Sequence, residues 1–313
     1  MTGAGSPLVI VNPRAGSGRA GRAFDGIRTV LERRLGAVDV SFTERPAHAI
    51  DLAREAVRGG KKLLIAVGGD GTLHEVANGV LEAGAAASVG YVGQGTGGDF
   101  RRTLGIEHRL DAYVGAIAAG RERRIDVGKV SYDVSPGVRH SRYFLNILSV
   151  GMGGLVVRYV KDSSLALGGA AAYFVGSARA LATCRRGRLR CDVRLEAESG
   201  QHVIHTFVFA VCNGSFFGGG MHVAPMAKLD DGRLDVISLD APSKLGLVAV
   251  GRHIYRGTHV SLPGVRHFEC DHLAIDIENE DARSAFLLEV DGEALGGLPL
   301  SVDLVPRALT FRA

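Results

Sequence analysis

The sequence contains no tryptophan, and aromatic residues make up only 6% of its 313 positions. It also lacks a strong charge of either sign, because 37 Lys and Arg offset 33 Asp and Glu to a formal net charge of +4. A balance this mild, without a segment rich in arginine and lysine, gives no support to nucleic-acid binding. It suits an anionic substrate or an anionic membrane surface. We therefore expect no nucleic-acid partner.

Cysteine is also scarce. The four residues, Cys184, Cys191, Cys212 and Cys270, show no CxxC spacing, which is typical of reduced, structural thiols in a cytosolic protein. The first residues show no basic leader or long apolar core. The uncharged, helix-like run of residues 163–178 is shorter than the roughly 20 apolar residues of a membrane-spanning helix. The expectation is a cytoplasmic protein that crosses no membrane.

Two different periods divide the chain. Over residues 1–125, short apolar runs alternate with segments whose apolar residues recur at helical spacing, such as Phe24, Ile27 and Leu31. Repeated strand–helix units predict a mostly parallel sheet covered by helices. Over residues 126–305, apolar and polar positions mostly alternate, which predicts antiparallel strands. Helical patterns interrupt them near residues 164–183 and 243–256. The predicted fold class is an α/β N-terminal domain followed by a β-rich, sandwich-like C-terminal domain.

Glycine is abundant, with 44 residues, and it clusters in loops that follow predicted strands. Such loops occur at residues 12–18, 68–72 and 93–100. In a parallel sheet, loops at the carboxyl ends of the strands converge on one crevice. A glycine-rich turn before a helix points backbone N–H groups at one anion, next to the positive end of the helix. The three loops therefore predict a nucleotide site.

Two familiar nucleotide motifs fit poorly. The run from Gly16 to Gly21 matches GxGxxG, but Asp39 falls at the start of the next strand, whereas a ribose-binding acid belongs at its end. The match from Gly93 to Gly98 has no acid suitably placed. A dinucleotide-dependent oxidoreductase is therefore disfavoured. The absence of GxxxxGKS/T excludes a P-loop NTPase.

Several of these runs resemble one known family. GGDGTLHEVANGV (Gly68–Val80), GTGGDFRR (Gly95–Arg102) and VNPRAGSG (Val11–Gly18) are similar to the diacylglycerol kinase catalytic family, which includes bacterial lipid kinases and sphingosine kinases. The similarity continues with Ala224-Pro225, KLDDGRLD (Lys228–Asp235) and VDGE (Val290–Glu293). GGDGT alone is shared with NAD kinases and phosphofructokinases, so the combination carries the resemblance.

The resemblance implies an ATP-dependent, Mg²⁺-dependent lipid kinase that transfers the γ-phosphoryl group to a hydroxyl of diacylglycerol or a related lipid alcohol. It also implies an active site in the cleft between the two domains, and residues 306–313 returning to the first domain. A peripheral contact with the membrane surface is expected, and pairing of exposed edge strands into a homodimer stays open.

The resemblance also assigns residues. The ATP site comprises Asn12, Pro13, Arg14, Ala15, Gly16, Thr43, Gly68, Gly69, Asp70, Gly71, Thr72, Leu73, His74 and Thr96. Asp70 and Asp99 are the candidates for holding Mg²⁺ against the phosphates, and Asp291 is the expected general base. A structural Mg²⁺ site would use the Asp231 carboxylate with backbone carbonyls of Lys228 and Arg233, all oxygen ligands suited to a hard cation. The chain departs from the family pattern at Gly98, where the family has asparagine.

Other interpretations stay open. Asp291 also fits a turn acid in an Asp-Gly hairpin. The apolar segment 165–181, followed by four arginines, predicts either a lipid-pocket wall beside a basic patch or a buried helix with a solvated turn; residues 215–221 are a second candidate lining. The alternatives in function are an NAD kinase-like enzyme acting on a soluble alcohol and a nucleotide-binding regulator without transfer activity. No motif specifies the lipid acceptor.

Overall fold

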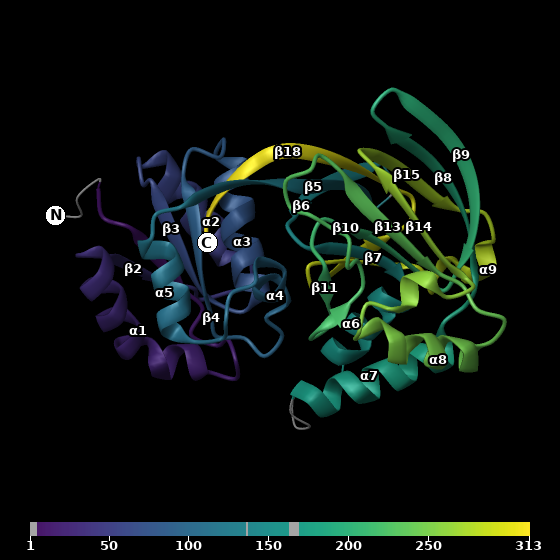
Figure 1. Cartoon of the computed structure of the whole chain (residues 1–313), viewed down its shortest axis with the longest axis horizontal. Helices are drawn as coiled ribbons and strands as arrows, with labels where there is room; N and C mark the ends of the chain where they lie inside the picture. Colours follow the sequence, from purple (N-terminus) through teal and green to yellow (C-terminus); the bar gives the residue numbers. More distant parts are fainter. Residues whose placement is uncertain (1–4, 136, 163–168) are drawn as a thin grey trace. The chain divides into compact units, whose positions relative to one another are not determined.

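The computed structural model describes residues 5–135, 137–162 and 169–313. They form two compact units, one made of Met1–Val127 with Pro306–Ala313 and the other of Gly128–Val305. We call them unit 1 and unit 2 and describe each by itself (Figure 1). Two strands, β5 and β18, begin in one unit and end in the other.

Unit 1 alternates strands and helices. Its elements are β1 (Leu8–Val11), α1 (Arg19–Leu35), β2 (Asp39–Phe42), α2 (His48–Arg58), β3 (Leu63–Gly68), α3 (Asp70–Glu82), β4 (Ser88–Gly93), α4 (Asp99–Leu104), α5 (Leu110–Ala118), the start of β5 (Glu122–Ser135) and the end of β18 (Leu300–Arg312).

The sheet of unit 1 is parallel, in the order β2-β1-β3-β4. The end of β18 adds to it, pairing Thr310 with Ser88 and Phe311 with Val89. Strands β1, β3 and β4 are buried along their whole length because helices cover the sheet. The helices pack as two pairs, α1 with α5 and α2 with α3. The predicted α/β domain is confirmed.

Unit 2 is rich in strands. Its elements are β6 (Val138–Phe144), β7 (Ile147–Gly151), α6 (Met152–Asp162), α7 (Gly169–Thr183), β8 (Gly187–Leu195), β9 (Glu198–Thr206), β10 (Val208–Cys212), β11 (Phe216–Phe217), β12 (Met221–His222), β13 (Leu234–Leu239), α8 (Lys244–Ile254), the 3₁₀ helix η2 (His259–Ser261), β14 (Val265–Cys270), β15 (His272–Ile277), α9 (Glu280–Arg283), β16 (Leu287–Val290) and β17 (Glu293–Gly297), with the rest of β5 and β18.

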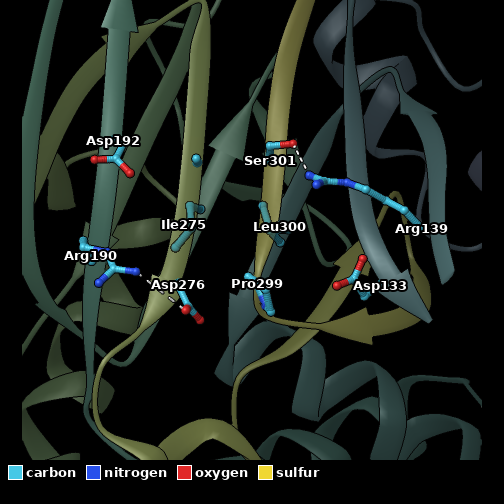
Figure 2. Close-up of a pocket in the computed structure, with 10 residues that line it drawn as sticks. Asp133, Arg139, Arg190, Asp192, Ile275, Asp276, Pro299, Leu300 and Ser301 are labelled. Atoms are coloured by element: carbon cyan, nitrogen blue, oxygen red, sulfur yellow. Dashed lines mark hydrogen bonds and ion pairs between the residues drawn. The ribbon is translucent and has the colours of Figure 1, made fainter. Parts of the chain in front are cut away.

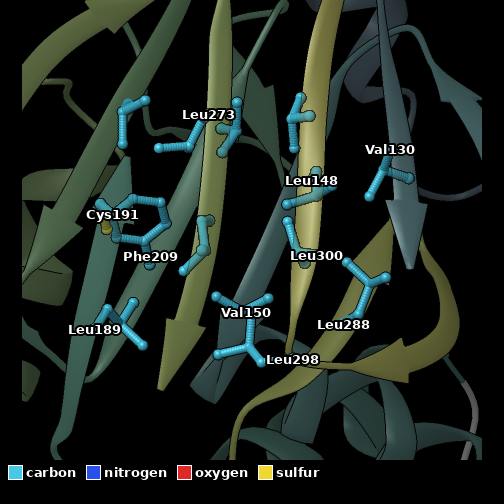
Figure 3. Packing of buried hydrophobic residues seen from close by; sticks show 14 of the residues in the cluster. Val130, Leu148, Val150, Leu189, Cys191, Phe209, Leu273, Leu288, Leu298 and Leu300 are labelled. Atoms are coloured by element: carbon cyan, nitrogen blue, oxygen red, sulfur yellow. The ribbon is translucent and has the colours of Figure 1, made fainter. Parts of the chain in front are cut away.

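Two antiparallel layers enclose the main core of unit 2. One contains β18, β15, β8 and β9, and the other has the order β14-β13-β10-β7-β16-β17. Alternate residues of both layers meet in a buried cluster that includes Leu148, Leu189 and Phe209 (Figure 3). The predicted sandwich-like domain is confirmed.

The central strands of the second layer, β7, β10 and β13, are buried on both faces. The residues that alternate with the sandwich core, such as Ala210 and Ile237, pack against Val250 and Ile254 of α8. This explains why β13 reads as a continuously buried run rather than as an alternating strand. Helix α6 was not predicted, and residues 164–168 of the expected helical segment lie outside the described residues.

Candidate active site

The three glycine loops, residues 12–18, 68–72 and 93–98, touch one another at the carboxyl edge of the unit 1 sheet. The backbone N–H of Gln94 donates to the Gly68 carbonyl over 2.6 Å. The Asn12 side-chain amide donates to the Thr72 hydroxyl over 3.2 Å. The Arg19 guanidinium donates to the Gln94 carbonyl over 3.0 Å. The convergence expected from strand order therefore exists within this unit.

Close packing accounts for three of the loop glycines. A Cβ atom on Gly16 would lie 2.3 Å from the Gln94 carbonyl oxygen, and one on Gly68 would lie 2.3 Å from the Thr72 hydroxyl. A Cβ on Gly95 would lie 2.7 Å from the Cα atom of Gly69. A side chain at Gly16 or Gly95 would push two loops apart, and one at Gly68 would collide with Thr72 within its own loop, so the junction depends on glycine.

Helix α3 begins at this junction with an open N-terminus. Its N-cap is Gly69, which offers no side chain to accept a hydrogen bond. The Gly69 carbonyl accepts from the N–H groups of Thr72 and Leu73. Helix geometry leaves the N–H groups of the first residues, Asp70 and Gly71, without intrahelical acceptors. Together with the positive end of the helix dipole, these groups form a favourable position for an anion.

Asp70 and Asp99 lie next to each other. One Asp70 carboxylate oxygen accepts from the backbone N–H of Asp99 over 3.0 Å, and the other accepts from the Tyr91 hydroxyl over 3.3 Å. Burial raises the pKa of Asp70, and the nearby Asp99 charge raises that pKa further. A Cβ atom built on Gly97 would lie 3.2 Å from Asp70 Oδ2 and 3.8 Å from Asp99 Oδ2, so both oxygens face the same point. Arg102 pairs with Asp99 over 3.0 Å.

The remaining predicted ATP-site residues differ in exposure. Arg14 and Thr96 are exposed, whereas Pro13, Ala15 and Thr43 are half-buried. Leu73 and His74 are each 1% exposed, and the His74 ring contacts Asn78 inside unit 1. A contact of Leu73 or His74 with a nucleotide would therefore have to involve the backbone.

Asp291 occupies the tip of the β16–β17 hairpin in unit 2. Asp291 and Gly292 have φ values of 47° and 91°, the pattern of a two-residue turn that favours Asp-Gly. The Asp291 carboxylate accepts three backbone N–H groups, from Leu145 (2.8 Å), Asn146 (3.1 Å) and Ile147 (2.9 Å). The interpretation of Asp291 as a turn acid is thus correct for its backbone. The three hydrogen bonds fix the orientation of its carboxylate.

Buried polar residues that no sequence motif indicated surround this hairpin. Glu289 is fully buried; it accepts from the Ser149 hydroxyl over 2.7 Å and from the Gly292 N–H over 2.5 Å. Asn213 donates to the Leu145 carbonyl over 2.8 Å. The sequence could have indicated these residues, because they are polar positions within otherwise apolar strands and a buried polar group needs a hydrogen-bond partner.

The predicted structural Mg²⁺ site lies at an exposed turn of unit 2. One oxygen of Asp231 accepts from the Arg233 N–H over 3.2 Å, which closes an Asx-type turn. The Arg233 side chain forms an ion pair with Glu269, and Lys228 is exposed. Cation binding at this turn stays a prediction.

The arginines that follow the apolar segment are paired with acids. The ion pairs are Arg185–Asp281 at 3.5 Å, Arg186–Asp240, Arg188–Glu278 at 2.9 Å and Arg190–Asp276 at 3.9 Å. Pairing reduces the net positive potential that a basic patch needs. Of the predicted lipid-pocket segment, residues 165–168 lie outside the described residues. The second candidate lining includes Phe216 and Phe217 of β11, which are half-buried.

A depression of about 240 Å³ lies on the outer face of unit 2 (Figure 2). Arg139 donates to Ser301 over 2.8 Å across it, and Arg190 approaches Asp276. Two arginines and three aspartates line the depression, and none of the predicted site residues lines it. In the part of the chain that the structure describes, no helix has the length and apolar composition to span a bilayer.

Comparison with known proteins assigns both units. Residues 6–130 match the diacylglycerol kinase catalytic domain, and residues 146–313 match the YegS C-terminal NAD kinase beta sandwich-like domain. A diacylglycerol kinase of Staphylococcus saprophyticus is 27% identical over 291 residues, which cover 93% of this chain and 90% of the relative. One from Staphylococcus epidermidis is 28% identical over 294 residues, covering 93% and 86%.

Solved structures share the fold. A diacylglycerol kinase from Bacillus anthracis superposes with a TM-score of 0.71 at 21% identity, covering 98% of this chain and 96% of the other. Yeast NADH kinase in complex with NADH gives a TM-score of 0.51 at 12% identity, covering 98% and 82%. Since one matching domain spans more than half of the chain and the other covers most of the remainder, the chain belongs to the diacylglycerol kinase catalytic family of kinases, with an NAD kinase-like fold.

Proposed function

We propose that this kinase transfers the terminal phosphoryl group of ATP to a hydroxyl of diacylglycerol or a related lipid alcohol. The observation that carries the proposal is the junction of the three glycine loops at the open N-terminus of α3. Backbone N–H groups there suit the phosphate oxygens of a nucleotide. The acceptor class is taken from the relatives, which are diacylglycerol kinases.

The carboxylates near the junction fit Mg²⁺. In phosphoryl-transfer sites this cation uses one or two protein carboxylates and takes its other ligands from phosphates and water. Asp70 and Asp99 face the same point, and among the described residues no cluster of three or more His, Cys, Asp or Glu side chains forms a closed cage. Asp70 and Asp99 would hold the cation, which when bound neutralises charge on the phosphate oxygens.

The protein's own part is mainly positioning. The Asn12–Thr72 hydrogen bond joins two of the loops, and the Gln94–Gly68 hydrogen bond joins the third. Phosphoryl transfer passes through a loose transition state, so fixed N–H donors and orientation supply most of the catalysis. No strongly basic side chain is required.

We assign the general base to Asp291. A carboxylate offers about four lone-pair sites, and three N–H groups occupy three of those on Asp291. These three donors fix the orientation of the carboxylate that would accept the hydroxyl proton.

The Asp291→Asn variant tests this role. We expect its turnover to fall roughly 10²- to 10⁴-fold, the usual contribution of general-base catalysis, with nucleotide affinity largely retained. The matched control is Glu293→Gln, which removes the same charge from the same hairpin and should keep its activity. Retained turnover in Asp291→Asn would move the base role elsewhere, with Asp70 next.

The acceptor is tested by incubating the protein with labelled ATP, Mg²⁺ and a total lipid extract, and by identifying the labelled product. A labelled phospholipid is expected. The same assay with NAD as acceptor checks the second candidate, which the fold shared with yeast NADH kinase favours. Label in a phosphorylated dinucleotide, with none in lipid, would replace the proposed acceptor.

A further inference from the structure

Helices α7 and α8 meet in unit 2, where the end of α7 contacts the start of α8. The Lys244 ammonium at the start of α8 donates to the Ala182 carbonyl near the end of α7 over 2.6 Å. Their inner residues, such as Ala180 and Leu247, join one buried cluster. The outward sides of both helices carry exposed apolar side chains.

These outward sides are unusually apolar. In α8, Leu245 is 81% exposed and Val248 is 46% exposed, and Tyr255 just beyond its end is 60% exposed. Their spacing of three and seven residues places them on one side of the helix, opposite the buried Leu247 and Ile254. In α7, Phe174 is 77% and Val175 is 38% exposed. Scattered exposed apolar residues are ordinary, but five on two adjacent helices indicate a binding surface. We call these five residues, with Arg252 and Arg256, the α7–α8 face.

The two sequence segments that carry the α7–α8 face contain basic but no acidic residues. The sequence has no Asp or Glu between Asp162 and Asp192, or between Asp240 and Glu269. Arg252 and Arg256 form no ion pair with any residue that the structure describes. This contrasts with Arg185 and Arg188, whose charges are matched by acids. The face therefore combines exposed apolar side chains with unneutralised positive charge.

We infer that the α7–α8 face docks on the surface of an anionic lipid bilayer. Leucine, valine and phenylalanine side chains would enter the boundary between headgroups and acyl chains, and Tyr255 suits that boundary because it is amphipathic. Arg252 and Arg256 would reach lipid phosphates while their stems stay on the apolar surface. A second copy of the same face is a poor occupant, because it would oppose like charges. The inference takes from the proposed function only that the acceptor lies in a bilayer.

The absence of tryptophan permits a direct test. Leu245→Trp gives a protein with a single tryptophan on the α7–α8 face, and Val203→Trp places one at an exposed position of β9. Vesicles of phosphatidylglycerol and phosphatidylcholine should shift the fluorescence emission of the Leu245→Trp protein to the blue, and brominated acyl chains should quench that emission. The emission of the Val203→Trp protein should change little.

Three outcomes would overturn the inference. The first is an equal response of both tryptophan variants to the vesicles, and the second is no response of either variant. The third is a blue shift in the Leu245→Trp protein that grows with protein concentration in the absence of lipid, because it would indicate self-association through this face.

The charges are tested by two variants that lose the same net charge. Arg252→Gln with Arg256→Gln should weaken vesicle binding roughly 30-fold, since each basic residue near an anionic surface contributes about fivefold. Arg185→Gln with Arg188→Gln is the matched control and should change binding much less. Equal losses in the two double variants would place the contact elsewhere.

Failure of this inference can be told from failure of the proposed function. Vesicle binding is measured without nucleotide, and kinase activity is measured separately on short-chain diacylglycerol in detergent micelles. Docking variants that keep micellar activity but lose activity on vesicles support the α7–α8 face. Vesicle binding by a protein without kinase activity on any lipid would leave the face intact and reject the proposed function.

Discussion

Gly98 forms the N-cap of α4 in the left-handed region, with φ 65° and ψ 39°. Glycine adopts this conformation without strain, and asparagine is one of the few other residues that tolerate it. The family pattern has asparagine at this position, so the change to glycine preserves the backbone that carries Asp99. What the chain loses is one amide side chain, not the turn.

A pair of substitutions checks this explanation. A Cβ atom at position 98 would lie 3.1 Å from Arg101 Nε, a buried donor without an acceptor among the described residues. The side-chain carbonyl in Gly98→Asn can accept from it, so the free energy of unfolding should stay within about 0.5 kcal/mol of the parent. Gly98→Ala should lose about 1–2 kcal/mol, the usual cost of a left-handed residue with a Cβ. Urea unfolding of both variants measures the difference, and equal losses would contradict the explanation.

Asp70 should make stability depend on pH. Burial raises its folded-state pKa above the ordinary value of 3.8. The stability associated with the protonated carboxyl is therefore fully present below pH 3.8 and is lost as the pH rises through the raised value. We expect Asp70→Asn to gain stability relative to the parent between about pH 3.5 and pH 7, while turnover falls. Urea unfolding across this range, compared with Asp25→Asn on the exposed face of α1, measures the effect. A difference that stays constant with pH would contradict it.

At the scale of elements, the periods of the sequence predicted most strands and helices of unit 1, because each of its elements has a local pattern. Helix α6 lacked such a pattern, since glycines at its start lower helix propensity. Those glycines serve packing: a Cβ atom on Gly154 would lie 2.1 Å from the Leu287 carbonyl oxygen. The Asp-Gly turn was predictable from the sequence. The three N–H donors to the Asp291 carboxylate were not, because they lie about 145 residues away in the chain and no local pattern encodes such a contact.

Strand β18 supports the candidate active site through its last residues. Phe311 is fully buried, and its ring packs edge-on against Phe100, 5.6 Å between centroids. Phe100 follows Asp99 at the start of α4. Phe311→Ala should therefore lower the free energy of unfolding by about 3–5 kcal/mol and weaken nucleotide binding, whereas Phe311→Leu should cost less on both counts. Thermal unfolding and nucleotide titration measure this. If Phe311→Ala lowered stability but left nucleotide affinity unchanged, β18 would not support the candidate active site.

At the scale of the molecule, the sequence indicated two fold classes. Each unit has its own core, and the apolar residues that form it recur with a different period along the sequence of each unit. In unit 1 the convergence of the glycine loops followed from strand order alone. The pairing of Arg185 to Arg190 with acids did not follow, since those acids come from two distant stretches of unit 2, at Asp240 and at residues 276–281. Motifs within one loop were therefore predictable, whereas the net charge of a surface was not.

The return of residues 306–313 to unit 1 has a consequence for biosynthesis. The ribosome makes the first 127 residues early, yet the strand that pairs with β4 emerges only after all of unit 2. Until then, one edge of β4 and the pocket that receives Phe311 stay open on the nascent chain. Unit 2 is thus complete in sequence before unit 1, and the candidate active site of unit 1 gains its last supporting strand at the end.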